Sequence, residues 1–346
     1  MYSVALAMIV RNESASLQRC LDSARAVTDS LVVIDTGSSD DTVQIALAAG
    51  ARVEHFTWID DFAAARNFAL ATANADWNVI LDADEAIADG GDVIASLRQV
   101  APNFVGKLRV ESEFETDGQS ARASSWIARV LPRGVKYSGR VHEQPVHQFP
   151  VRNLLVVVQH SGYLPQAMQA KQGRNVQLLE RALIESPGNG YLLYQLGKDY
   201  AVYHRYDEAA QVFAQADSVL GPRHSLGHDL LLRWLFALKK LERFVIAVEL
   251  AESRQDMWAE SPDYWFVVGD LLLDFACSQP EHAANLMPLI ESSWLRCLEI
   301  GERPDLEGAV HGRGSYLAAK NLAVIYEGSG RSAEAMRYRK LAKLAT

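Results

Sequence analysis

Short apolar runs alternate with amphipathic stretches over roughly the first 160 residues of the chain. Continuous apolar runs of strand length cover residues 3–10, 31–34, 52–56 and 77–81. Apolar residues at helical spacing fill the intervals at residues 14–26, 42–49 and 62–73. This alternation predicts βαβ units and a parallel sheet covered by helices on both faces. Longer runs with polar alternation, at residues 104–115, 124–131 and 154–159, predict additional strands that make the sheet mixed.

Helical periodicity replaces the strand pattern from about residue 166. Bulky, small and aromatic residues recur there in the order of a tetratricopeptide repeat. The most regular unit contains Leu193, Leu196, Gly197, Tyr200, Ala209, Phe213, Ala216 and Pro222. Three less regular units follow, around Trp234, Trp265 and Tyr326. We expect an α/β domain over residues 1–165 and an all-α, tetratricopeptide-like domain over residues 166–346, with a plain helical bundle as the alternative for the second.

The composition narrows the class of protein. Hydrophobic residues make up 49% of the 346 residues and charged residues 22%, which is typical of a folded globular chain. The formal net charge of −9 argues against nucleic acid as a partner. Three scattered cysteines indicate neither a disulfide framework nor a zinc cluster. Because no apolar run reaches the ~18 residues of a membrane span and no signal-peptide pattern precedes residue 10, we expect a cytoplasmic protein without a transmembrane segment.

Acidic residues follow two of the expected strands. Asp35 comes after the second strand, and Asp82 and Asp84 come after the fourth. In a parallel sheet, ligands bind at the carboxyl ends of the strands, where these residues would lie. Two carboxylates at a strand end suit a hard cation such as Mg²⁺ or Mn²⁺, which in turn binds a diphosphate. Gly37 and Ser38 open the next helix, where free backbone N–H groups favour an anion.

Four segments carry a resemblance to a known family: residues 8–13 (MIVRNE), 33–42 (VIDTGSSDDT), 61–67 (DFAAARN) and 81–85 (LDADE). In this order and spacing they resemble the catalytic domain of family 2 glycosyltransferases, whose GT-A fold is a Rossmann-like mixed sheet. Residues 139–143 (GRVHE) and 160–163 (HSGY), followed by helical repeats, resemble a narrower branch. That branch includes sublancin-type peptide S-glycosyltransferases and some lipopolysaccharide-core glucosyltransferases.

The resemblance implies roles for the matching residues. Asp35 would contact the nucleotide base, Asp82 the ribose or the metal, and Asp84 the metal directly. Arg66 would bind the diphosphate or a neighbouring aspartate, for which a guanidinium is suited. The nucleotide pocket would be lined by Val10, Arg11, Asn12, Glu13, Gly37, Ser38 and Ala83.

An inverting transfer needs a base that takes the proton of the acceptor. Glu143 is the favoured candidate and His142 its rival. If both lie on one strand, as we expect, they point to opposite faces and only one enters the site. In the resembled fold a late histidine commonly completes the metal shell, and His160 has that place here.

The leading functional hypothesis is therefore a metal-dependent, inverting glycosyltransferase that uses a nucleotide-sugar, with UDP as the expected nucleotide. A concave helical repeat suits an extended peptide or protein acceptor. A lipopolysaccharide-core or other glycan acceptor is the alternative. A non-catalytic repeat scaffold is the alternative of another class, and self-association through the repeats is compatible with either. A sugar nucleotidyltransferase is disfavoured because the chain lacks a Gly-rich, basic N-terminal loop.

Overall fold

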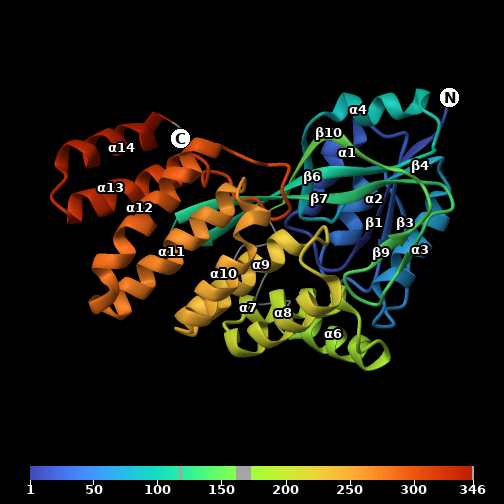
Figure 1. Ribbon diagram of the computed structural model, residues 1–346. Helices are drawn as coiled ribbons and strands as arrows, with labels where there is room; N and C mark the ends of the chain where they lie inside the picture. The colour runs from blue at the N-terminus through green and yellow to red at the C-terminus, as the bar shows by residue number, and fades with distance from the viewer. Residues whose placement is uncertain (117–118, 161–172, 345–346) are drawn as a thin grey trace. The chain divides into compact units, whose positions relative to one another are not determined.

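The computed structural model describes residues 1–116, 119–160 and 173–344 (Figure 1). The chain divides into two units, Met1–Glu185 and Ser186–Thr346. The domain boundary expected at residue 165 lies in the segment 161–172, outside the described residues, as do the last three residues of the 160–163 motif.

The first unit is built on an eight-stranded mixed sheet in the order β3-β2-β1-β4-β7-β6-β10-β5. Its first four strands are parallel to one another and alternate with helices, as the hydrophobic pattern predicts. These elements are β1 (Val4–Val10), α1 (Leu17–Arg25), β2 (Ser30–Asp35), α2 (Thr42–Ala48), β3 (Arg52–His55), α3 (Phe62–Ala73) and β4 (Trp77–Ile80).

Helices cover both faces of the parallel strands. Side chains at alternate positions of β1 point to opposite faces, because a strand has a period of two. Leu6 and Met8 pack on one side with residues of α1, α2 and α4 (Gly91–Ser96). Ala7 packs on the other side with Ala63 and Ala69 of α3. Burial on both faces explains why β1 is apolar along nearly its whole length.

The rest of the sheet confirms the expected mixed extension. Its strands are β5 (Glu85–Asp89), β6 (Val105–Thr116), β7 (Gln119–Pro132) and β10 (Val151–His160). The strand β7 pairs antiparallel with β4 and β6, whereas β10 runs parallel to β6. A separate two-stranded sheet consists of β8 (Lys136–Ser138) and β9 (Gln144–Val146). The 3₁₀ helix η1 (Leu97–Gln99) follows α4, and α6 (Arg174–Glu185) ends the unit.

One element near the acidic turn, the strand β5, is not predicted by the sequence pattern. Residues 85–89 form β5, although Glu85 and Asp89 favour a turn. The strand exists because it pairs antiparallel with the end of β10, a partner about 70 residues later whose register no local pattern encodes. Glu85 therefore begins a strand and does not belong to the preceding turn.

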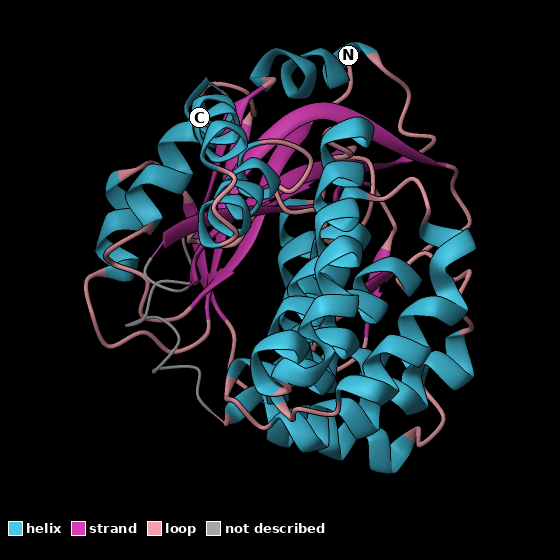
Figure 2. Cartoon of the chain, turned by 60° about the vertical axis from the view of Figure 1, so that its left-hand side comes forward, coloured by secondary structure: helices cyan, strands magenta, loops and turns pink. Residues whose placement is uncertain are grey.

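The second unit is helical, and none of its described residues forms a strand. Figure 2 draws the helices of the chain in cyan. Its helices are α7 (Gly190–Val202), α8 (Tyr206–Leu220), α9 (Gly227–Lys240), α10 (Phe244–Trp258), α11 (Pro262–Ser278), α12 (Ala283–Ile300), α13 (Tyr316–Gly328) and α14 (Ser332–Leu344), with the 3₁₀ helix η2 (Pro280–His282) between α11 and α12. Small residues let paired helices approach: a Cβ on Gly197 would lie 2.5 Å from the ring of Phe213, and one on Gly269 would lie 2.6 Å from the ring of Trp294. This is the packing expected of tetratricopeptide-like pairs.

An irregular connection, residues 301–315, joins α12 to α13 and bonds to helices earlier in the chain. The backbone N–H of Val310 and the guanidinium of Arg313 both donate to the buried carboxylate of Asp263 on α11, at 2.9 and 3.0 Å. The backbone carbonyl of Glu307 lies 2.7 Å from Nδ1 of the buried His228 on α9. Within the described residues, no helix combines the length and the apolar character that a membrane span requires.

Candidate active site

The acidic residues singled out in the sequence meet at one edge of the sheet. Asp35 is the last residue of β2, and Asp82 and Asp84 lie in the turn after β4. The strands β2 and β4 flank β1 and are both parallel to it, so their carboxyl ends lie at the same edge. This is the edge at which open α/β sheets bind ligands.

Asp35 is buried and its carboxylate is held by its own loop. The backbone N–H groups of Gly37 and Ser38 donate to it at 3.2 and 3.0 Å, and Nδ1 of His55 lies 3.2 Å away. Burial alone would raise the pKa of Asp35, but the hydrogen bonds from Ser38, Gly37 and His55 outweigh it and lower the pKa. Asp35 is therefore ionised at neutral pH, and its exposed neighbour His55 is a group that the sequence reasoning missed.

The loop after β1 and the loop after β2 are joined by polar contacts. Oδ1 of Asn12 accepts from the backbone N–H of Ser39 at 2.8 Å, and the backbone N–H of Asn12 donates to Ser38 Oγ at 2.9 Å. The N–H of Glu13 donates to Thr42 Oγ1 at 2.7 Å. Val10 is buried beneath these loops, whereas Arg11, Asn12 and Gly37 are exposed at their surface. The predicted lining of a nucleotide pocket is thus brought together.

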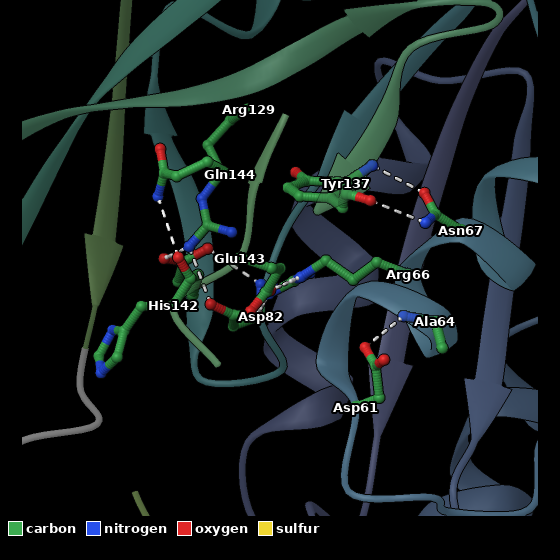
Figure 3. A network of polar contacts seen from close by, with 11 residues as sticks. Asp61, Ala64, Arg66, Asn67, Asp82, Arg129, Tyr137, His142, Glu143 and Gln144 are labelled. Carbon is green, nitrogen blue, oxygen red and sulfur yellow. Dashed lines mark hydrogen bonds and ion pairs between the residues drawn. The ribbon is translucent and has the colours of Figure 1, made fainter. Parts of the chain in front are cut away.

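Two arginines hold Asp82 from opposite sides (Figure 3). Nη2 of Arg66 on α3 lies 2.7 Å from Oδ1, and Nη2 of Arg129 on β7 lies 2.8 Å from Oδ2. Arg129 also lies 2.5 Å from Oε1 of Glu85, whose Oε2 accepts from the backbone N–H of Asp82 at 2.9 Å. Burial would raise the pKa of Asp82, but Arg129 and Arg66 lower it far below its usual value. For the buried Glu85, desolvation dominates and raises the pKa despite Arg129.

Glu143 lies beside the same cluster, as an ion-pair partner of Arg66. The side chains of both residues are 9% exposed. Residues 139–143 connect β8 to β9 and do not form a strand, and His142 has a left-handed backbone with φ of 48°. The expectation that His142 and Glu143 alternate on one strand is therefore wrong.

The segment that carries Glu143 is fixed to α3. The side-chain amide of Asn67 donates to the backbone carbonyl of Tyr137 at 2.9 Å and accepts from its N–H at 2.7 Å. The guanidinium of Arg66 lies 5.6 Å from the centroid of the Tyr137 ring. Figure 3 shows Arg66, Glu143 and Asp82 pointing toward one another from three separate segments. Helix α3 thus positions the candidate base relative to the acidic turn.

Asp84 and His160 form a second cluster next to the first. Nε2 of His160 lies 3.4 Å from Oδ2 of Asp84, and Nδ1 lies 3.0 Å from Ser112 Oγ. Burial alone would lower the pKa of His160, but the hydrogen bond to Asp84 and the charges of Asp84, Glu85 and Asp82 raise it. The buried Ala83 links Asp84 to Asp82. Of the expected metal ligands, the structure brings Asp84 and His160 together and directs Asp82 toward arginines.

No group of three or more His, Cys, Asp or Glu side chains in the described part of the chain is arranged to hold a metal ion by itself. The donor types nevertheless fit Mg²⁺ or Mn²⁺. A carboxylate and an imidazole supply two positions, and Mg²⁺ in particular keeps waters or substrate phosphates in the others. The contact of Ser112 with the second ring nitrogen is the type of outer-shell bond that orients a histidine ligand.

The sequence reasoning missed Arg129 and Glu85. Arg129 lies 47 positions after Asp82, in a strand whose residues alternate between polar and apolar. One signal was available: a charged residue in a strand that pairs with the fully buried β4 needs a partner of opposite charge. For His55, the parallel register of β2 and β3 places it directly beside Asp35.

Comparison with known proteins matches the segment that carries most of the site to a family model. Residues 5–116 match the family model "Glycosyl transferase family 2". This segment contains β1 to β6, with Asp35, Arg66, Asp82 and Asp84. The chain therefore combines a segment that matches the family 2 glycosyltransferase model with tetratricopeptide-like helices.

Each of the curated relatives is named for one of these two features. A TPR repeat-containing protein of Synechococcus elongatus is 53% identical, over 57% of this chain and 52% of that protein. The SPbeta prophage-derived glycosyltransferase SunS of Bacillus subtilis is 28% identical, over 60% of this chain and 51% of that protein. An uncharacterized glycosyltransferase of Rickettsia prowazekii is 35% identical over 25% of this chain and 30% of its own length. The chain thus spans about half the length of the first two relatives that it matches.

Two solved structures are each similar to part of the chain. MamA covers 53% of this chain and 94% of its own, with 16% identity and a TM-score of 0.39. Glucosyl-3-phosphoglycerate synthase of Mycobacterium tuberculosis, crystallised with Mn²⁺, UDP and glucosyl-3-phosphoglycerate, covers 33% of this chain and 44% of its own, with 24% identity and a TM-score of 0.26. Likeness at these TM-scores says nothing of the substrates of this chain.

Proposed function

We propose that this protein is a metal-dependent, inverting glycosyltransferase that moves a sugar from a UDP-sugar to a peptide or protein acceptor. The observation that carries the proposal is the meeting of Asp35, Asp82 and Asp84 at the carboxyl edge of β2 and β4, inside the segment that matches the family model. A site of this kind, at this place in an α/β sheet, suits a nucleotide with a diphosphate.

The donor would lie across the joined loops. Asp35 faces the base in this proposal, and Asn12, Glu13 and Ser38 line the nucleotide. Nη1 of Arg66 is buried without a hydrogen-bond partner among the described residues, which supports a role toward an anionic oxygen that completes its donors. Because Arg66 stays charged at any working pH, it would favour the diphosphate throughout the reaction.

Asp84 and His160 would hold the Mg²⁺ or Mn²⁺ ion. When bound, the ion neutralises the charge that develops on the leaving diphosphate. For this, Nε2 of His160 must be free of its proton and turned to the ion, while Nδ1–H donates to Ser112 Oγ. Asp84 is preferred to Asp82 as the metal ligand, because both oxygens of Asp82 accept from arginines.

Glu143 is the proposed base, which takes the proton of the acceptor as the acceptor attacks the anomeric carbon. Its position beside Arg66 and Asp82 supports this role, because the base must lie close to the donor sugar. Its ion pair with Arg66 opposes the role, because a paired carboxylate is a weaker base. His142, the neighbouring residue, is the rival.

A peptide or protein is the proposed acceptor. The helical repeats support this choice, because a concave repeat array suits an extended chain. A glycan acceptor remains the alternative within the same class. The Synechococcus relative is described only by its repeats, so a purely partner-binding scaffold is the alternative that an activity assay must exclude.

A panel of nucleotide-sugars tests the proposal. The wild-type protein should release UDP from at least one UDP-sugar in the presence of Mn²⁺, and mass spectrometry of treated cell lysates should find a glycosylated peptide or protein. D84N should lose the UDP release. D92N is the matched control, because Asp92 is an exposed residue on α4 of the same unit. Release that is unchanged in D84N, or no release from any donor, would refute the proposal.

A further inference from the structure

Arg129 and Glu85 form a buried ion pair directly behind Asp82, and the family match does not extend to Arg129. We propose that Arg129 and Glu85 are a positioning pair, which fixes Asp82 as the hydrogen-bond acceptor for a ribose hydroxyl of the donor. This inference rests on the proposed function, since it concerns how the same site holds a nucleotide.

The first argument is geometric. Asp82 is fixed at three points: Oδ1 by Arg66, Oδ2 by Arg129, and its backbone N–H by Oε2 of Glu85 at 2.9 Å. Each carboxylate oxygen has a second lone pair after it accepts one hydrogen bond. With both oxygens held, the carboxylate cannot rotate, so the remaining lone pairs keep a constant direction.

The second argument is the pattern of exposure. The side chains of Arg66 and Glu143 are each 9% exposed, that of Arg129 is 8% exposed and that of Glu85 is 3% exposed. The side chain of Asp82 is 37% exposed. Of the three carboxylates in the cluster, Asp82 is therefore the most exposed, and its oxygens can accept a hydrogen bond from a ligand.

The third argument is the distribution of charge. The cluster contains two guanidinium groups and three carboxylates, so it carries a net charge of about −1 when all are ionised. A single buried arginine beside Asp82 would neutralise it. Because Glu85 also pairs with Arg129, and Glu143 with Arg66, neither arginine neutralises Asp82 alone, and Asp82 stays a hydrogen-bond acceptor. Two adjacent guanidinium groups also make Asp82 a poor ligand for a divalent cation, and a hydroxyl donor suits it better.

The first test variant removes both charges of the Glu85–Arg129 ion pair, so that neither charge is left buried and unpaired. In the double variant E85Q/R129M, one positive and one negative group disappear together. R129K is the second variant, because lysine keeps the charge but lacks the fork that bridges two carboxylates. R133M is the control: Arg133 lies just after β7 and its partner is the half-buried Asp76.

Calorimetric titration of the full-length proteins in Mn²⁺ tests the inference. UDP, GDP, CDP and ADP are titrated first. The 2′-deoxy and 3′-deoxy forms of the nucleotide that binds are then titrated for comparison. Wild type and R133M should prefer the ribonucleotide to one of the deoxy forms by about 10–100-fold, the value of a hydrogen bond to a charged group. E85Q/R129M should bind the ribonucleotide about tenfold more weakly and distinguish the deoxy form by less than about threefold, with R129K between the two.

The outcomes separate the inference from the proposed function. Undiminished discrimination in E85Q/R129M, uniform weakening that leaves the discrimination ratio unchanged, or a wild type that binds a ribonucleotide and its deoxy forms equally, overturns the positioning role and leaves the glycosyltransferase proposal standing. A wild type that binds none of the nucleotides overturns both. If E85Q/R129M does not fold, the ratio measured for R129K decides, since the wild-type ratio in R129K contradicts the inference.

Discussion

Replacing Glu143 by glutamine separates two roles that this carboxylate can have, as the base of the reaction or as the anchor of Arg66. The substitution keeps the shape of the side chain and removes its negative charge. Arg66 retains Asp82 as a partner at 2.7 Å, so the buried guanidinium is not left alone. We therefore expect the free energy of unfolding to fall by about 1.5–3 kcal/mol, the value of one hydrogen bond to a charged group.

The expected loss of activity is larger than instability can explain. A general base contributes about 10²–10⁴-fold, which corresponds to about 3–5 kcal/mol of activation free energy. A protein with ordinary stability of about 5–15 kcal/mol stays more than nine-tenths folded after losing 3 kcal/mol. A hundredfold loss in E143Q would therefore report on chemistry.

The assay pairs urea unfolding with the rate of UDP release from the active donor, at saturating acceptor once the acceptor is known. Nucleotide affinity should change little in E143Q. E54Q is the control, because Glu54 pairs with Arg52 at 2.9 Å on the surface of β3. If E143Q loses the expected stability but keeps its rate within tenfold of wild type, Glu143 is the anchor of Arg66, and the base is His142 or another group.

Three further predictions concern other parts of the chain. S112A should weaken Mn²⁺-dependent UDP binding by about 10–100-fold, because Ser112 orients His160; affinity equal to wild type would contradict the metal assignment. Burial raises the pKa of Asp199 to about 6, above its usual 3.8, so the ionised carboxylate destabilises the folded state above pH 6 and this cost disappears as the pH falls toward 3.8. D199N should accordingly raise the free energy of unfolding by about 1–2 kcal/mol near pH 8 and by almost nothing near pH 4. The control D256N, at an exposed position, should leave the free energy of unfolding unchanged at both pH values. An equal gain for D199N at both pH values would refute this reasoning. A chain ending at Pro187, just beyond the first unit, should still bind UDP and Mn²⁺ but transfer poorly to the true acceptor, and full-rate transfer would show that the repeats do not hold the acceptor.

The sequence predicts the local elements well and the long-range pairings poorly. Helix α3 was expected at residues 62–73 and has those bounds, because Asp61 caps its first turn through the N–H of Ala64 and Asn74 ends it in a left-handed conformation. The acidic residues were predicted because each follows its own strand. Arg129 contacts Asp82 from 47 positions away, and Glu143 contacts Arg66 from 77 positions away, and both contacts depend on sheet order and loop path.

The expected strand at His142 and Glu143 is a case in which the sequence pattern predicts the wrong local structure. Residues 139–143 contain a glycine and several polar residues, and their conformation follows from tertiary contacts such as the bond from the N–H of Phe62 to the carbonyl of Arg140 at 2.8 Å. Because the sequence does not reveal that contact, it predicts an alternating strand for these residues. The roles of these two residues therefore depend on a loop geometry that the sequence does not encode locally.

The connection at residues 301–315 changes how the helical unit should unfold. In a simple repeat array each pair of helices contacts only its neighbours, so pairs can be lost from one end in succession. Here the buried Asp263 on α11 and His228 on α9 both bond to a segment that follows α12. Detaching the last helices would leave a buried carboxylate and a buried imidazole without these partners. The connection therefore links α9 and α11 to the segment before α13, so that α9 to α13 should unfold as one cooperative unit. Their amide hydrogens should exchange together and not in steps.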